Sequence, residues 1–294
     1  MRTRDFVLVV VAAVLWGTGG ALGSLLADNG AVPPASVAMW RMLIAGVVLT
    51  LWLLVRSGIG RLDRAMLIRI LLTGALIALF EVLYFTGIEL AGVGLATLVA
   101  IGSAPVWVAI WDAVRLREAP GATGVVALLI ALAGLIALTG SSLNAGGSAL
   151  AGVGVSLLTG AAFAAVTVSN RTPVPGLGAV RLTALSFSAG GLMLVPVAAL
   201  SGWGVPEGID GWGWALALGI LATALAYVAY LSGLETVPPF VATIVALLEP
   251  LVAAVLGALV FAERLGWWGV VGGVALASAV VVLRPQRDEP VAVP

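Results

Sequence analysis

The sequence predicts an all-α polytopic membrane protein with ten transmembrane helices, built as two inverted five-helix repeats. Three observations carry this prediction: an apolar composition, apolar stretches of similar length, and an internal repeat. Of the 294 residues, 62% are hydrophobic and only 10% are charged. Because soluble domains usually contain about a quarter charged residues, we expect lipid to be the main solvent of this chain.

Each apolar stretch is close to the roughly 20 residues that cross a bilayer as a helix. The first stretch is too long for the apolar region of a signal peptide, and a second span follows it after a short loop, so we expect a retained helix. Tight turns with helix breakers, at 91–94 and 238–239, separate two pairs of neighbouring spans. The predicted spans are 6–26, 34–55, 66–89, 91–111, 120–139, 149–169, 178–200, 212–234, 238–261 and 265–283.

The arginines, which are the only basic residues, fall almost entirely on one side of the predicted membrane. They precede the first span, lie in or beside the even-numbered loops, and follow the tenth span. Loops 27–33, 140–148 and 201–211 contain none, and Arg264 is the exception. Since cytoplasmic loops carry an excess of basic residues, both termini are predicted to be cytoplasmic. The expected location is the cytoplasmic (inner) membrane of a bacterium or archaeon.

An internal repeat relates the two halves of the chain. Segment 84–89, Tyr-Phe-Thr-Gly-Ile-Glu, matches segment 230–235, Tyr-Leu-Ser-Gly-Leu-Glu, at the tyrosine, the glycine and the glutamate. After a one-residue slip, Pro105 matches Pro250, and paired glycines follow in both halves. The third to fifth spans therefore resemble the eighth to tenth.

The number of spans in each half determines how the halves enter the membrane. Five is odd, so the two halves must have opposite orientations, and inverted repeats of this kind build a site near the bilayer midplane. We predict the first repeat at residues 1–142 and the second at residues 143–294.

The residue types that are missing exclude several kinds of chemistry. The chain has no cysteine and no histidine, which removes thiolate and histidine metal sites and the Ser-His and Cys-His nucleophiles. Asp28, Asp63, Asp112 and Asp210 fall at or near loops, so an intramembrane aspartyl pair is not expected. Zero net charge gives no argument for a nucleic-acid partner. We therefore expect no enzyme activity, no cofactor and no metal.

Other transport classes are also disfavoured. A primary pump would need a glycine-rich phosphate loop and a nucleotide-binding domain, and a channel would need a ring or filter of polar groups; the sequence contains neither pattern. The expected partners are a small-molecule substrate, protons in a coupled mechanism, and the lipid bilayer. The sequence leaves a monomer and a homodimer as alternatives.

Several short motifs, taken in their order, resemble those of a known family. Together they are typical of the EamA-type members of the drug/metabolite transporter superfamily, and the resemblance covers essentially the whole chain. It implies ten helices, inverted five-helix halves and transport of small organic solutes by alternating access. Known members export amino acids, drugs and other metabolites, and some relatives import quaternary amines. The motifs are Trp16-Gly17-Thr18, Arg41, Gly87–Ala91, Leu248–Leu251, and Glu263 followed by Gly269.

Glu81 is the most unusual of the candidate site residues. It has apolar neighbours on both sides and lies near the predicted bilayer centre, where a carboxylate costs several kcal/mol unless it is protonated, paired or hydrated. The resemblance implies an uncharged polar residue or histidine here more often, so Glu81 is a departure that bears on specificity. The alternative is a glutamate paired with Arg41 for packing alone. Arg41 itself must pair, line a cavity or reach the membrane surface.

Two prolines are predicted to bend helices near the site. Pro105 in the fourth span and Pro250 in the ninth each remove a backbone hydrogen bond. Glu249 precedes Pro250, and it either serves the opened helix or takes part in coupling.

Aromatic side chains are expected to surround the carboxylate. Trp16 lies near the middle of the first span, Tyr84 lies one helical turn beyond Glu81, and Tyr227 and Tyr230 come from the second half. Aromatic faces attract cations, so this set is a candidate binding surface for an amine; ordinary helix packing is the alternative.

Two mechanisms follow from these residues. In the first, Glu81 carries a proton in exchange for substrate, which makes the protein a proton-coupled exporter and is the favoured interpretation. In the second, Glu81 stays ionised and binds a cationic or quaternary amine such as choline during potential-driven uptake.

Overall fold

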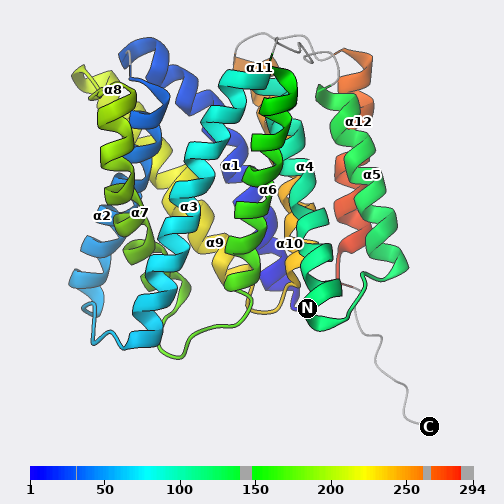
Figure 1. The fold of residues 1–294 in the computed structure, drawn as a ribbon, viewed down its shortest axis with the longest axis horizontal. Coiled ribbons are helices and arrows are strands. Elements are labelled where there is room, and N and C mark those ends of the chain that lie inside the picture. Colours follow the sequence, from blue (N-terminus) through cyan, green and yellow to red (C-terminus); the bar gives the residue numbers. More distant parts are fainter. Residues whose placement is uncertain (31, 140–147, 261–265, 286–294) are drawn as a thin grey trace.

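The computed structural model describes residues 1–30, 32–139, 148–260 and 266–285, and of 27–30 the backbone alone. All regular elements in these ranges are helices (Figure 1). The first half contains α1 (Thr3–Gly30), α2 (Pro34–Arg56), α3 (Arg64–Ala91), α4 (Val93–Trp111), the π-helical turn η1 (Asp112–Leu116) and α5 (Ala122–Thr139). The second half contains α6 (Ala149–Ser169), α7 (Ala179–Ser201), α8 (Gly208–Gly219), the π-helical turn η3 (Ile220–Leu225), α9 (Ala226–Gly233), α10 (Pro239–Ala246), α11 (Leu248–Val260) and α12 (Trp267–Leu283).

These helices confirm the predicted fold class. In the described ranges, nine helical stretches are long and apolar enough to cross a membrane, and α12 is a shorter apolar helix of 17 residues. The eighth span consists of α8, η3 and α9 in direct succession, and the ninth of α10 and α11. The ten predicted spans correspond to these elements, with ends that differ by a few residues.

Local sequence explains the boundaries of α3. Asp63 caps its start by accepting a hydrogen bond from the Met66 backbone amide at 2.8 Å. Its end is set by Gly92, whose φ of 81° is readily adopted by glycine. Gly92 alone separates α3 from α4, as expected from the tight turn at 91–94.

The two halves have opposite orientations (Figure 1). Helix α1 begins, and α12 ends, at one face of the bundle, which we call the terminal face. Helix α6, the first of the second half, begins at the other face, which we call the opposite face. The packing follows this symmetry: α3 packs on α6 as α9 packs on α1, while α2 pairs with α7 and α5 pairs with α12.

The glycines of the sequence repeat allow two equivalent helix contacts. A Cβ atom at Gly87 would lie 2.7 Å from the Ser156 hydroxyl oxygen on α6. A Cβ atom at Gly233 would lie 2.8 Å from the Asp5 carbonyl oxygen on α1. Both glycines therefore permit the third helix of one half to approach the first helix of the other.

Two interruptions lie in the membrane-spanning part of the second half. The π-helical turn η3 interrupts the eighth span, and Leu247 separates α10 from α11 three residues before Pro250. In the first half, α4 continues through Pro105 without a break.

Some sequence predictions lie outside the described residues. They concern the boundary between the repeats at 142 and 143, the exceptional Arg264, and Glu263 of the family motif.

Candidate functional site

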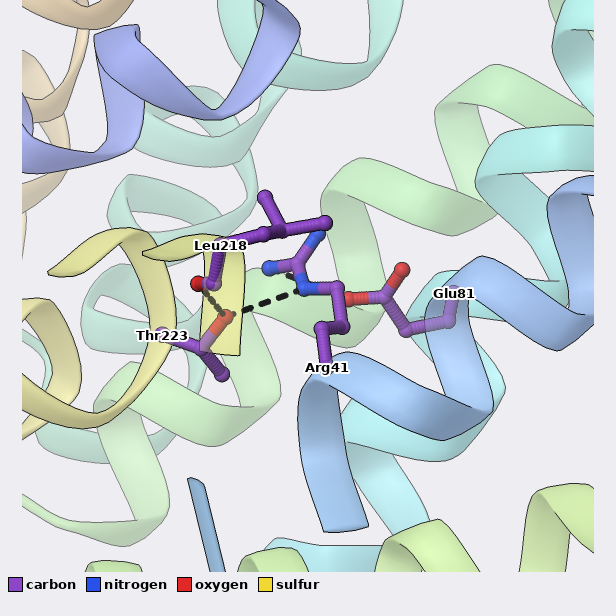
Figure 2. Close-up of polar contacts among 4 residues, drawn as sticks. All are labelled: Arg41, Glu81, Leu218 and Thr223. Carbon is purple, nitrogen blue, oxygen red and sulfur yellow. Dashed lines mark hydrogen bonds and ion pairs between the residues drawn. The ribbon is translucent and has the colours of Figure 1, made fainter. Parts of the chain in front are cut away.

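Arg41 and Glu81 form an ion pair inside the bundle. Arg41 lies on α2 and Glu81 on α3, and their closest nitrogen and oxygen atoms are 3.4 Å apart (Figure 2). The Glu81 side chain is only 1% exposed, and that of Arg41 is 20% exposed. The structure thus contains the Arg41–Glu81 pair that is one of the two interpretations of Glu81 from sequence, and the carboxylate lies away from both faces of the bundle.

The Glu81 carboxylate is incompletely satisfied. Neither of its oxygens accepts a hydrogen bond from any described residue, although both are buried. The contact with Arg41 is a charge interaction without hydrogen-bond geometry. Leaving a buried polar atom without a hydrogen-bond partner costs about 1–3 kcal/mol of stability, and more if the atom is charged. The carboxylate is therefore well suited to accept a proton or to bind an ammonium group.

The π-helical turn η3 holds the Arg41 guanidinium through a residue from the second half of the chain. The Nε atom of Arg41 donates a hydrogen bond to the Thr223 hydroxyl at 3.3 Å (Figure 2). The same hydroxyl donates to the Leu218 carbonyl at 2.9 Å, five residues earlier in the chain. Because π-helical turns free backbone carbonyls and often occur at functional sites, η3 provides the anchor that holds Arg41 between the two halves.

Glu249 is the second carboxylate near this cation. It is partly buried in the first turn of α11, two residues after the break at Leu247. The positive end of a helix dipole favours a carboxylate at this place. Glu249 also lies within electrostatic reach of both Arg41 and Glu81. It comes from the second half of the chain, whereas Arg41 and Glu81 come from the first.

The charges of this cluster do not balance when all groups are ionised. Arg41 contributes one positive charge, and Glu81 and Glu249 contribute two negative charges. A proton or a monovalent cation would neutralise the excess. Elsewhere in the described chain, no three histidine, cysteine, aspartate or glutamate residues lie close enough together to hold a metal ion.

An aromatic cluster lies between α1, α6 and α9. The Trp16 ring centroid is 5.0 Å from that of Tyr227, 4.9 Å from that of Tyr230 and 5.7 Å from that of Phe163. The Tyr230 hydroxyl is hydrogen-bonded to the Thr167 hydroxyl at 2.8 Å. The Tyr227 ring lies within electrostatic reach of Arg41, which connects this cluster to the charged groups.

Tyr84 has other partners than Trp16. Its ring stacks on Phe80 with centroids 5.7 Å apart, and its hydroxyl is hydrogen-bonded to Thr97 of α4 at 2.8 Å. Phe80 lies 6.0 Å from Phe163, so Tyr84 joins the aromatic cluster only through these two phenylalanines. It remains within electrostatic reach of Glu81.

The comparison with protein families agrees with this architecture. The model of the EamA-like transporter family matches residues 5–140 and again residues 150–284. The chain belongs to this family. The two matches correspond to the two halves described above.

Full-length relatives of this EamA-like transporter occur in bacteria and archaea. It is 28% identical to the uncharacterized transporter YwfM of Bacillus subtilis, over 96% of this chain and 94% of that one. It is also 28% identical to an uncharacterized transporter of Archaeoglobus fulgidus, over 93% and 94% of the two chains. The uncharacterized inner membrane transporter YicL of Salmonella typhimurium is 26% identical, over 94% and 93%.

A solved crystal structure shares the same fold. It aligns with a TM-score of 0.82 over 96% of this chain and 97% of that one, at 19% sequence identity. Together with the family match, the apolar helices establish a multi-pass membrane protein of a transporter family.

Sequence reasoning missed part of the site in this EamA-like transporter. Thr223, which contacts Arg41, lies in the π-helical turn η3, and this turn was not predicted from the sequence. Phe163 was detectable in principle. It lies about as far from the start of α6 as Trp16 does from the start of α1, so extending the repeat to these two helices would have paired them.

Proposed function

We propose that this EamA-like transporter moves a small organic metabolite by alternating access, and that it is a proton-coupled exporter in which Glu81 carries the proton. The observation that supports this most directly is the buried Glu81 carboxylate, which has one neighbouring cation and no hydrogen-bond donor among the described residues. Such a carboxylate is stabilised by a proton when no substrate is bound, and by the amine of the substrate when substrate is bound.

Exchange follows if proton and substrate compete for one carboxylate. Arg41 reduces the cost of the ionised form, and Thr223 and Leu218 hold Arg41 across the interface of the two halves. Glu249 from the second half interacts electrostatically with both Arg41 and Glu81, so a change of charge on either residue affects it. A rearrangement of the halves would change all of these contacts together, as alternating access requires.

The aromatic cluster supports a second candidate function, uptake of a cationic or quaternary amine driven by the membrane potential. Trp16, Tyr227 and Tyr230 lie beside a cluster with excess negative charge, and aromatic faces attract cations. Moving one positive charge through the membrane releases about 2.3 kcal/mol per 100 mV.

A screen followed by flux measurements distinguishes the two functions. Thermal-shift screening of the purified protein against amino acids, amines and choline-like compounds should identify a ligand. In proteoliposomes, we expect its transport to follow an imposed pH gradient and to run opposite to the proton. Uptake that follows voltage and ignores the pH gradient would favour the second function and contradict proton exchange.

We also propose that the terminal face is cytoplasmic. Helix α2 ends, and α3 and α7 begin, at that face (Figure 1). Arg56 is the last residue of α2, Arg61 lies in the loop that leads to α3, and Arg181 lies in the first turn of α7. Arginine is enriched on the cytoplasmic side of membrane proteins.

This orientation predicts the outcome of cysteine labelling. The chain contains no cysteine, so single cysteines can be introduced at exposed Ser201 on the opposite face and at exposed Arg61 on the terminal face. An impermeant thiol reagent added to intact cells should label Ser201→Cys and not Arg61→Cys. Labelling of Arg61→Cys alone would reverse the orientation.

A further inference from the structure

A crevice between α2, α3 and α7 connects the buried Glu81 with the surface. Its volume is about 120 Å³, and its lining includes both Glu81 and Glu89 of α3. The walls are formed by Thr86 of α3, Ala38 of α2, and Leu194 and Val197 of α7. None of the aromatic-cluster residues lines this crevice, so the crevice reaches Glu81 by a route separate from that cluster.

The two glutamates lie at opposite ends of this crevice. Glu81, Phe85 and Glu89 follow one another at intervals of four residues, which places them along one stripe of α3. With a rise of 1.5 Å per residue, Glu81 and Glu89 are separated by about 12 Å along the helix axis. Glu89 is exposed near the end of α3 at the opposite face, while Glu81 is buried.

The size and lining of the crevice fit water. A cavity holds a water molecule once about 10–15 Å³ is open to the water centre, so this crevice has room for several waters. Organic ligands usually need about 300 Å³ or more. The polar groups that can hold water include the two Glu81 oxygens, which lack hydrogen bonds to described residues, and the Thr86 hydroxyl; Ser201 and Glu89 also line the crevice. That hydroxyl donates to the Val82 carbonyl at 2.8 Å, and its oxygen remains able to accept.

We propose that this crevice is a water-filled proton path from the opposite face to Glu81, with Glu89 attracting protons at its mouth. The substrate takes a different route, because the volume of the crevice is well below the roughly 300 Å³ of pockets that bind organic ligands. This inference rests on the proposed function in one respect, that Glu81 is the proton carrier.

Only a few charged or titratable groups face Glu81 besides Glu89. Helices α4 and α6 have no charged residue, and Arg181 lies in the first turn of α7, which begins at the terminal face (Figure 1). Once past Glu89, a proton that travels through the crevice therefore meets Glu81 before any other charged group. The groups near it are Arg41 from α2, Tyr84 from α3, Tyr227 from α9 and Glu249 from α11.

The first test measures water access with single cysteines in this cysteine-free chain. The probe is Ag⁺, a small cation that binds thiolates and does not cross the bilayer freely. It is added in chloride-free buffer to sealed vesicles with the opposite face outward, and a blocked cysteine is detected because it no longer reacts with a maleimide after the protein is unfolded. We expect Thr86→Cys to react from outside and not from inside. Leu79→Cys is the control, because Leu79 lies on the outer surface of the same helix, where lipid excludes the reagent. Thr86→Cys reacting no faster than Leu79→Cys would overturn the crevice path.

The second test measures proton delivery without a substrate. After the pH outside the vesicles is lowered, protonation of Glu81 should appear as a carbonyl band in the infrared difference spectrum, and Glu81→Gln should remove that band. Glu89→Gln should slow its appearance about tenfold, since a negative charge at the mouth of a cleft raises the local concentration of cations. Thr86→Val, which keeps the shape of the side chain, should slow it as well.

The outcomes separate the two proposals. Glu235→Gln serves as a matched control, since Glu235 is the repeat equivalent of Glu89 and follows α9 at the terminal face. A band that persists in Glu81→Gln would refute Glu81 as the carrier and with it the proposed function. A band that depends on Glu81 but forms at the wild-type rate in Glu89→Gln and Thr86→Val would overturn the crevice path alone.

Discussion

Glu81→Gln is expected to abolish transport driven by a pH gradient while leaving the protein folded. Glutamine keeps the shape of the side chain but neither carries a proton nor attracts an ammonium group. The substitution also removes a buried charge whose oxygens accept no hydrogen bond from described residues. Arg41 keeps Glu249 as a nearby counter-charge and is not left uncompensated, so the melting temperature in detergent should stay the same or rise. The measurement is gradient-driven flux in proteoliposomes, with the melting temperature recorded for the same preparation.

The exposed Glu235 offers a matched control for this variant, because Glu235→Gln makes the same chemical change away from the site. It should transport at wild-type rates. If Glu81→Gln transports like the wild type across the pH range, then the assignment of the site is wrong.

Arg41→Met is expected to destabilise the folded protein strongly. It removes the cation from Glu81 and leaves a 1%-exposed carboxylate without a compensating charge. Breaking a buried ion pair on one side costs about 3 kcal/mol or more in soluble proteins, and we expect a comparable loss here as a large drop in melting temperature. Loss of the hydrogen bond to Thr223 adds to the effect.

The double variant Arg41→Met/Glu81→Gln separates charge from packing. Once Glu81 is neutral, the loss of Arg41 should cost much less, so the double variant should melt well above Arg41→Met. Equal melting temperatures for the two would mean that Arg41 stabilises the bundle through contacts other than the pair.

Much of the fold could be predicted from the sequence because membrane spans have a strong local signal. Apolar length determined the ten spans, and the repeat of Tyr84 to Glu89 at Tyr230 to Glu235 indicated the inverted halves. The repeated glycines Gly87 and Gly233 then proved to allow equivalent helix contacts. These features depend on composition and spacing alone.

The site was less accessible from sequence because it depends on how helices from both halves meet. The pairing of Arg41 with Glu81 was one alternative among several, since the rotation of α2 relative to α3 decides it. Thr223 reaches Arg41 through a change of helical register at η3. The Tyr84 ring contacts Phe80 and Thr97 rather than Trp16. The spacing between Tyr84 and Glu81 in the sequence does not indicate which of these partners the ring takes.

The most direct test of competition between proton and substrate at Glu81 is the release of protons on binding. The strongest ligand from the thermal-shift screen is added to the purified protein in weakly buffered detergent solution, and the pH is followed with an indicator dye. We predict that the wild type releases protons as the ligand binds, because binding to the ionised carboxylate displaces the bound proton. Glu81→Gln should release none. Ligand binding to the wild type without any change of pH, or equal release from Glu81→Gln, would contradict the proposed mechanism.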